Sequence, residues 1–423
     1  MLRLSAGQVL IEPGQRPVRN GAVLISGDRI VAAGPQEAVP SPDGSRQLSF
    51  AGCTALPGLI DSHVHLTLNT RPDCLDVLMA EDDEALTQRA LDNARRMAVA
   101  GITTVLDLGA RDDTGFAIAQ AAARHPWAMA RVLTAGSPIT PRRGHTWFFG
   151  GEADGVKAVT AAVRARAECG AALIKMIATG GAMTAGTDPA AASYPGKVLA
   201  AAAREAHSLG LSITAHAHGV AGIRAALAAG LDAVEHVTMM GPDGQWQFDT
   251  ALARQMAAIG IRAIPTAAAG RRYERSGASW VAELPGKAMS SETRVANAAR
   301  LTEAGVPIVA GTDAGVAHTD FADGLFCELE AYVDAGMTPA DAIRAATATA
   351  AVHLGLQGLV GMLDVGHSAD VLVVAGDPLS DITALRRTRL VVRAGRPAEP
   401  IPPPAEPPQP RAAGSAGRQI TRT

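Results

Sequence analysis

The central part of the chain repeats one pattern, in which a short apolar run is followed by an alanine-rich stretch with helical spacing. This alternation is typical of strand–helix units that build a parallel sheet. Eight such runs predict an α/β fold of the (β/α)8 TIM-barrel type, and the competing interpretation is a doubly wound open sheet. The expected strands are 59–66, 102–108, 130–135, 173–178, 212–216, 233–236, 262–265 and 307–310.

Both ends of the chain have a different, β-rich pattern. The apolar runs 22–25 and 29–32 are separated by Gly27 and Asp28, which predicts a hairpin. We therefore expect a small β-sandwich formed from both chain ends, residues 1–56 plus 359–398, attached to a barrel of residues 57–358. Residues 400–410 contain seven prolines, so the segment 399–423 is expected to be a disordered tail outside the fold.

Composition excludes several classes of protein. With aromatic residues at 3% of 423 positions, the core must consist mainly of Ala, Val, Leu and Ile. The formal net charge is −3, from 38 basic and 41 acidic residues, so we expect neither nucleic acid nor a membrane surface as partner. Cys53, Cys74, Cys169 and Cys327 lie far apart, which favours free thiols in a reducing compartment. No signal peptide or membrane helix is predicted, so we expect a cytoplasmic protein.

The strongest local signal is a pair of histidines in the first expected barrel strand. His63 and His65 flank Val64, and residues two apart on a strand point to the same side. Two imidazoles directed at one point suit a metal ion such as zinc. Such a pair also occurs by chance, so it does not establish a metal site alone.

Further polar residues stand where other expected strands end. These are His216 and His218 at the end of the fifth, His236 at the end of the sixth and Asp313 after the eighth. In a (β/α)8 barrel the carboxyl ends of the strands meet on one face, where catalytic residues lie. Chance or a purely structural role explains any one of these residues but is a poor explanation for all of them together.

Lys175 is out of place in the apolar run Leu173–Ile177. Burying an unpaired ammonium group is costly. An ion pair with a nearby acid, or a lysine stem that reaches the surface, would explain it structurally. The functional explanation is carboxylation by CO₂, which turns the cation into an anionic ligand able to bridge two metal ions.

Taken together, His63, His65, Lys175, His216, His236 and Asp313 resemble the amidohydrolase superfamily in order and in strand position. The runs Ile174-Lys175 through Gly181 and Ala215 through Gly219 are similar to its imidazolonepropionase-like and prolidase-like branch. This branch contains Xaa-Pro and Xaa-Arg dipeptidases, carboxypeptidases and ochratoxin-type amide hydrolases. The resemblance extends from about residue 23 to residue 395.

The resemblance implies the roles of these residues. His63 and His65 would bind the more buried of two divalent ions, and His216 and His236 would bind the second. N6-carboxylated Lys175 would bridge them, and zinc is the expected metal. Asp313 would bind the first ion and transfer protons, with His236 and His218 also in the catalytic set. The choice between His216 and His218 as metal ligand stays open, because both lie on one face of the strand.

The implied reaction is hydrolysis of an amide C–N bond in a dipeptide or N-acyl amino acid. A metal-bridging hydroxide would be the nucleophile, because two cations lower the pKa of water. The alternatives are a mononuclear cyclic-amide hydrolase of imidazolonepropionase type and, more remotely, a non-catalytic scaffold with this fold. A homo-oligomer is left open.

Further residues are expected to contact the substrate besides His218. His145 matches a histidine that the branch uses near the substrate, and Arg143 beside it would add a cation for a carboxylate. Tyr194 follows the fourth strand, where family members often have an aromatic residue. His318 lies five residues after Asp313 and is expected near the mouth of the site.

Overall fold

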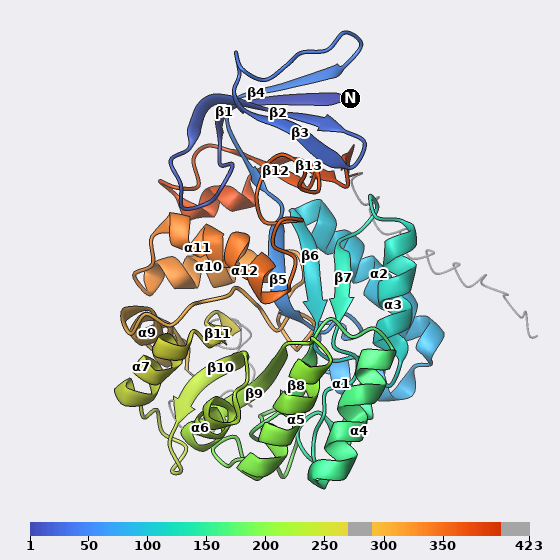
Figure 1. Cartoon of the computed structure of the whole chain (residues 1–423), viewed down its shortest axis with the longest axis vertical. Helices are drawn as coiled ribbons and strands as arrows, with labels where there is room; N and C mark the ends of the chain where they lie inside the picture. Colours follow the sequence, from blue (N-terminus) through green and yellow to red (C-terminus); the bar gives the residue numbers. More distant parts are fainter. Residues whose placement is uncertain (270–289, 399–423) are drawn as a thin grey trace, which may run out of the picture.

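The computed structural model describes residues 1–269 and 290–398. The expected proline-rich tail, 399–423, lies outside this range, so its disorder stays a prediction. The described residues form a β-rich unit above a larger part in which parallel strands are surrounded by helices (Figure 1). None of the helices within these residues is long and apolar enough to cross a bilayer. All four cysteines are free.

The β-rich unit is one seven-stranded sheet made from both ends of the chain, in the order β14-β13-β12-β4-β1-β2-β3. The expected hairpin is present as β2 and β3, which pair antiparallel. The predicted sandwich is not confirmed, because both ends join this single hydrogen-bonded sheet. Its strands are β1 (Leu2–Val9), β2 (Val18–Ser26), β3 (Arg29–Pro35), β4 (Arg46–Pro57), β12 (Val371–Ala375), β13 (Thr388–Arg393) and β14 (Arg396–Pro397).

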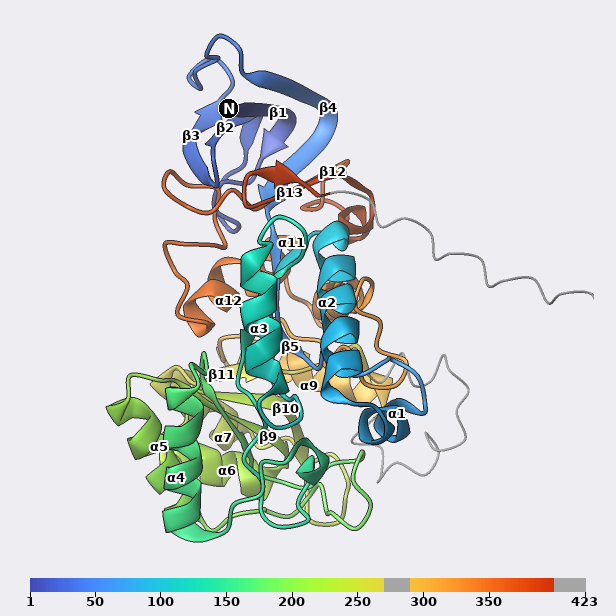
Figure 2. The same ribbon diagram turned by 90° about the vertical axis from the view of Figure 1, so that its right-hand side faces the viewer.

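The larger part contains two parallel sheets whose strands follow in sequence order. Neither sheet has the order reversal that defines a doubly wound sheet, so this competing interpretation is wrong. The fold is TIM-barrel-like, with helices outside the strands (Figures 1 and 2). The first sheet has β5 (Leu59–Val64), β6 (Ile102–Asp107) and β7 (Arg131–Thr134); the second has β8 (Ile174–Ile177), β9 (Ile213–Gly219), β10 (Ala233–Met240) and β11 (Arg262–Ile264).

Short contacts connect the two sheets at their outer strands. Between β7 and β8, the Ile139 amide donates to Lys175 O at 2.8 Å, and the Ile177 amide donates to Ile139 O at 2.9 Å. The eighth expected strand, 307–310, forms only an isolated bridge to β11. On its other side, this segment contacts β5 through a hydrogen bond from Ser62 N to Ala310 O at 3.0 Å. The segment 307–310 thus lies between β11 and β5, where the eighth strand was expected, but it does not form a regular β-ladder with either of them.

Helices follow the parallel strands, and several of them begin at polar caps. Asp82 accepts from Ala85 N at the start of α2, and Ser290 accepts from Thr293 N at the start of α9. Their alanine-rich faces pack on the strands, which is how a core with few aromatic rings becomes close-packed. The helices are α1 (Cys74–Ala80), α2 (Asp83–Ala100), α3 (Thr114–Arg124), α4 (Gly155–Glu168), α5 (Gly196–Ser208), α6 (Val220–Ala229), α7 (Thr250–Ile259), α9 (Ser291–Glu303), α10 (Gly324–Asp334), α11 (Pro339–Ala345) and α12 (Ala348–His353).

A buried histidine in α12 makes stability sensitive to acid. His353 is 3% exposed, and neither ring nitrogen has a hydrogen-bond partner. Burial lowers the pKa of His353 from 6.5 to about 4. Between these values the unfolded chain binds a proton that the folded chain does not bind, so the free energy of unfolding falls as pH drops. At 1.36 kcal/mol per pKa unit, the whole window corresponds to about 3 kcal/mol.

The variant His353→Leu is expected to remove this contribution. Denaturant unfolding between pH 7.5 and pH 4 should show a shallower fall in stability than in the wild type, by about one proton. The relevant quantity is the difference in slope between His353→Leu and the wild type, because other buried histidines with a lowered pKa also make the stability of both proteins depend on pH. The exposed His125→Gln variant is the control and should follow the wild type. Equal slopes for all three proteins would contradict the assignment to His353.

Candidate metal centre and active site

The carboxyl ends of the parallel strands deliver a dense group of ionisable side chains to one cavity. The cavity has a volume of about 400 Å³. Strand β5 contributes one histidine and the residue directly after it a second, β8 a lysine, β9 two histidines and β10 one histidine, while the segment after residue 310 contributes an aspartate. These lining residues are His63, His65, Lys175, His216, His218, His236 and Asp313.

The first donor group combines β5 with the segment after residue 310. His63 Nε2 and His65 Nε2 lie 3.3 Å and 3.2 Å from Asp313 Oδ1. One ligand atom from each of the three residues lies within 4.8 Å of the others. His65 Nδ1 contacts Gly109 O at 3.2 Å. A carbonyl only accepts hydrogen bonds, so Nδ1 carries a proton, and Nε2, which here contacts Asp313, is the nitrogen that a bound metal ion would use.

The second donor group consists of three imidazoles, from His216, His218 and His236, with ligand atoms within 4.8 Å of one another. Each ring is fixed through one nitrogen. His216 Nε2 contacts Gly180 O at 3.0 Å, His218 Nδ1 contacts Thr238 Oγ1 at 2.7 Å, and His236 Nδ1 contacts Thr266 Oγ1 at 2.9 Å. This pattern of one anchored and one available nitrogen is typical of metal-ligating histidines.

Burial sets the protonation of these rings. It lowers the pKa of His63, His216, His218 and His236 well below the usual value, since a charged imidazolium is poorly solvated there. Neutral imidazole is the form that binds metal ions. His65 differs, because the hydrogen bond and charge of Asp313 outweigh burial and raise its pKa. In turn the neighbouring His63 and His65 outweigh burial at Asp313 and lower its pKa, so this carboxylate is ionised.

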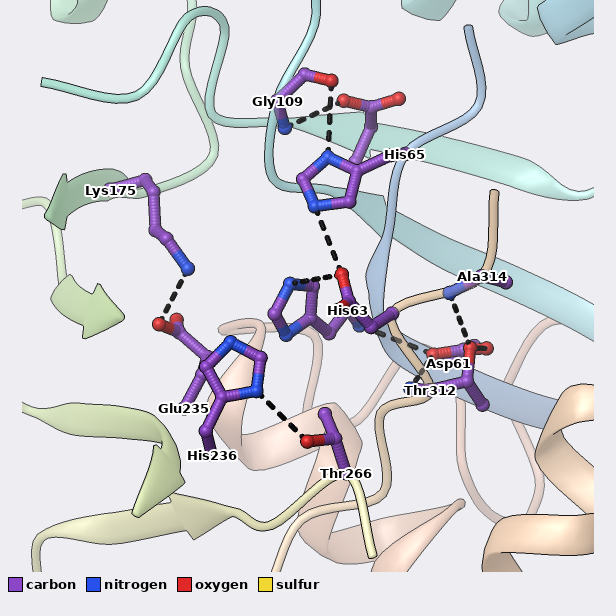
Figure 3. Close-up of polar contacts among 12 residues, drawn as sticks. Asp61, His63, His65, Gly109, Lys175, Glu235, His236, Thr266, Thr312 and Ala314 are labelled. Atoms are coloured by element: carbon purple, nitrogen blue, oxygen red, sulfur yellow. Dashed lines mark hydrogen bonds and ion pairs between the residues drawn. The ribbon is translucent and has the colours of Figure 1, made fainter. Parts of the chain in front are cut away.

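Strained backbone aims two of these side chains at the cavity. His236 and Asp313 have φ values of 65° and 63°, in the left-handed region that non-glycine residues rarely adopt. At Asp313 the turn is held by Asp61, which accepts from Thr312 Oγ1 at 2.7 Å, from Thr312 N at 3.1 Å and from His63 N at 3.2 Å. Asp61 therefore ties the two segments of the first donor group together (Figure 3).

Lys175 is paired with an acid that sequence reasoning did not select. Its Nζ lies 2.5 Å from Glu235 Oε2, and the two side chains are 3% and 0% exposed (Figure 3). Thr214 Oγ1 donates to the other oxygen, Oε1, at 2.5 Å. The sequence held one signal for this residue, a glutamate inside an otherwise apolar strand. Strand alternation would place Glu235 and His236 on opposite sides of β10. The left-handed turn at His236 breaks this alternation.

Of the residues expected to contact substrate, His145 and His218 line the cavity. His145 Nδ1 contacts Thr184 Oγ1 at 3.0 Å, and its ring centroid lies 4.5 Å from that of His216. A Cβ on Gly181 would lie 2.4 Å from His145 Nε2, so this position requires glycine. Burial lowers the pKa of His145 to about 3.

Three other expected contacts are not among the described residues that line the cavity. Arg143 is exposed, and its backbone amide donates to Glu152 at 2.5 Å. Tyr194 is buried in the core, where its hydroxyl donates to Ala153 O at 2.7 Å. His318 is half-buried, and its backbone amide donates to Thr70 O at 2.7 Å. The positions of these three side chains therefore give no support for a direct contact with a substrate in this cavity.

Sequence reasoning also missed Arg294, which lines the cavity from α9 and is 5% exposed. It lies in a polar-looking helix with no motif around it, so no local pattern marks it. Only the packing of α9 beside the β10 and β11 ends brings the guanidinium to the histidines.

Comparisons with known proteins agree with this geometry. A sequence model of the amidohydrolase family matches residues 54–397. The chain is 30% identical to an ochratoxinase from Aspergillus niger over 414 residues, covering 90% of this chain and 83% of the relative. It is 27% identical to an imidazolonepropionase from Micrococcus luteus, covering 91% of this chain and 96% of the relative.

Solved structures show the same similarity in three dimensions. A crystal structure of a Xaa-Pro dipeptidase with bound methionine in the active site matches with a TM-score of 0.82 and 25% identity, covering 94% of this chain and 100% of that chain. The crystal structure of the A. niger ochratoxinase matches with a TM-score of 0.82 and 26% identity, covering 96% and 97%.

Proposed function

Because this chain belongs to the amidohydrolase family, and is therefore a metal-dependent hydrolase of C–N bonds, we propose that it cleaves the amide bond of a dipeptide or N-acyl amino acid. The observation that carries this proposal is the pair of three-donor groups that face one cavity from the strand ends. A cavity of about 400 Å³ also falls within the size range of small-molecule sites.

The donor sets fit two divalent ions, for which we propose zinc. His63, His65 and Asp313 would hold the first ion, and His216 and His236 the second, with His218 beside them. Nitrogen and carboxylate donors suit zinc, and all four ring anchors described above leave one nitrogen available. When bound, such ions supply a nucleophilic water near neutral pH and polarise a carbonyl group.

The side chains of this protein would handle the protons. Asp313 is held ionised by its imidazole neighbours, so its Oδ1 can accept a proton from the attacking water and return it to the leaving amine. His218 is anchored through Nδ1 to Thr238, which leaves Nε2 to contact the carbonyl oxygen as negative charge develops there. His145 stands next to His216 on the same side of the cavity and would orient the substrate.

Lys175 is our proposed site of N6-carboxylation. It lines the same cavity as the two donor groups, and an anionic bridge there would match the charge of two metal ions. In the unmodified chain its ammonium group pairs with Glu235, so modification requires this pair to open. Incorporation of ¹³C-bicarbonate detected by NMR reports on the modification independently of activity.

Three further proposals go with this function. The parallel strands and the segment 307–310 would close into one eight-stranded barrel, with the chain ends as a separate domain. We also propose a cytoplasmic location and small-molecule or dipeptide substrates, without nucleic-acid or membrane partners. The β-sandwich boundaries and a homo-oligomeric state stay predictions.

The test combines metal analysis with a hydrolysis screen on the purified full-length protein. We expect about two divalent ions per chain, and we expect chelation to abolish cleavage of Xaa-Pro, Xaa-Arg and N-acyl amino acid substrates. Activity should return on adding zinc to the chelated protein. A fully loaded protein that cleaves no member of the panel would refute the proposal.

One observation favours a second candidate, a mononuclear enzyme that opens a cyclic amide. The Lys175–Glu235 pair leaves the lysine as an unmodified cation, which is not a metal ligand. A stoichiometry of one ion per chain, without carboxylated lysine and with lactam opening, would favour this candidate. The non-catalytic scaffold is the weakest alternative, since the five expected ligand positions other than Lys175 all hold donor side chains.

A further inference from the structure

The turn after β11 is built on a strained threonine. Thr266 has a φ of 49°, in the left-handed region, which is an outlier for a β-branched residue. It is fully buried, and its hydroxyl contacts His236 of the second donor group (Figure 3). A strained conformation persists only where the surrounding structure holds it, so the contacts of this turn identify what keeps it in place.

The hydroxyl of Thr266 sets the tautomer of His236. Thr266 Oγ1 lies 2.7 Å from Pro265 O, and since a carbonyl oxygen only accepts, the single hydroxyl hydrogen is donated there. The lone pairs of Oγ1 then accept from Arg294 Nη1 at 3.2 Å and from His236 Nδ1 at 2.9 Å. His236 therefore carries its proton on Nδ1, which leaves the lone pair on Nε2 for a metal ion.

A buried carboxylate holds the residues that follow Thr266. Glu328 lies in α10, 61 residues from Ala267, and is 0% exposed. Its Oε1 accepts from Ala267 N at 2.6 Å, and its Oε2 accepts from Ala268 N at 2.8 Å. Both alanines are buried, and a buried amide without an acceptor is costly. The carboxylate thus supplies the acceptors that allow the chain to turn directly after Thr266.

The first donor group is held in a similar way. Asp313 also has a positive φ, and Asp61 accepts from Thr312 N and Thr312 Oγ1 directly before it. Each donor group thus has a left-handed residue in it or in contact with it, and a buried carboxylate that accepts from the backbone beside that residue. Asp61 lies in β5 among the ligands, whereas Glu328 reaches its turn from a helix.

Resting on the proposed function, we propose that Glu328 is a positioning residue for the second donor group. It holds the turn at Thr266, and through Thr266 it keeps His236 in the tautomer and orientation that bind a metal ion. Glu328 is not among the described residues that line the cavity, so it acts without touching the substrate. Removing a group that orients a metal-binding histidine typically lowers metal affinity by about 10- to 100-fold.

The experiment measures zinc binding by the purified full-length protein in competition with a chromophoric chelator. The wild type should bind two ions. Glu328→Gln should weaken one of them by about 10- to 100-fold and the other by less than about threefold, because glutamine has one acceptor oxygen and turns an N–H group toward the second amide. Thr266→Val should have the same effect, while Thr266→Ser keeps the hydroxyl and should bind like the wild type. Glu330→Gln is the matched control, since Glu330 is half-buried on the same helix and outside the cavity lining.

A second measurement does not depend on metal or activity. Nitrogen-15 NMR of the metal-free protein with labelled histidine reports the tautomer of each ring, and His236→Gln identifies the signal of His236 by its loss. The wild type should show the Nδ1–H form, and Glu328→Gln should show the Nε2–H form or a mixture. If Glu328→Gln does not fold, Glu328→Asp takes its place in both measurements, because it keeps the carboxylate but shortens its reach.

The two measurements separate this inference from the proposed function. Wild-type affinity for both ions in the Glu328 variant, or an equal fall for both, would overturn the role of Glu328. If the wild type binds fewer than two ions, the proposed two-ion site fails, and the NMR experiment decides about Glu328. A changed tautomer of His236 in the Glu328 variant then supports the inference, and an unchanged tautomer overturns it.

Discussion

Replacing Asp313 with asparagine is expected to reduce kcat/KM by at least about 10³-fold. The asparagine side chain would keep the size of the aspartate but lose both its charge and its capacity to take up a proton. Asp313 Oδ1 is within 3.3 Å of His63 Nε2 and within 3.2 Å of His65 Nε2, so the substitution also weakens the first donor group. Steady-state kinetics and metal content on the same preparation separate the two effects.

The control for this variant is Asp243→Asn in an exposed turn, where the side chain accepts from Gln245 N. Asparagine retains the accepting oxygen, so activity and metal content should equal the wild type. If Asp313→Asn keeps two metal ions and loses activity, Asp313 acts mainly in proton transfer. Wild-type activity in Asp313→Asn would refute its assignment to the catalytic set.

Replacing Glu235 with glutamine is expected to lower the free energy of unfolding of the metal-free protein by roughly 3 kcal/mol. The substitution leaves the Lys175 ammonium, which is 3% exposed, without a charged partner. It also weakens the hydrogen bond from Thr214 to a charged acceptor. Urea unfolding at pH 7 after chelation measures the loss.

A double-mutant cycle with Lys175→Met identifies the source of this loss. Removing both charges should be far less harmful than removing the glutamate alone, because a methionine fits an apolar strand without an ionic partner. Additive losses would contradict direct pairing. If Lys175 is carboxylated in the loaded enzyme, the coupling between the two positions should disappear there, and the ¹³C label should be absent from Lys175→Met.

The candidate site was largely predictable because it depends on local spacing. Strand alternation puts His63 and His65 on one side, and the parallel arrangement brings the strand ends together, so both donor groups follow from short sequence patterns. His145 lines the same cavity, and its contact with substrate stays a prediction. Tyr194 and Arg143 show the limit of this reasoning, because a loop side chain points inward or outward according to packing that no spacing rule describes.

The lysine shows a different limit. The sequence marked Lys175 as a buried cation that needs compensation, and it left an ion pair and carboxylation open. Which acid compensates the charge depends on a contact between β8 and β10, whose strands lie on either side of β9. That contact measures 2.5 Å, and the left-handed turn at His236 brings the next side chain along β10 to the cavity as well.

The amino-acid sequence by itself determined the alternation of strands and helices, the residue types of the candidate metal centre and the end of the strands at which these residues lie. These features depend on periodicity and on residues close together in the chain. Only the tertiary structure decided that both chain ends join one sheet, that Glu235 neutralises Lys175 and that Arg294 enters the cavity. Each of these three features either joins segments at least 60 residues apart in the chain or places a helix beside the cavity. Such contacts depend on the packing of the whole chain, so no local sequence pattern predicts them.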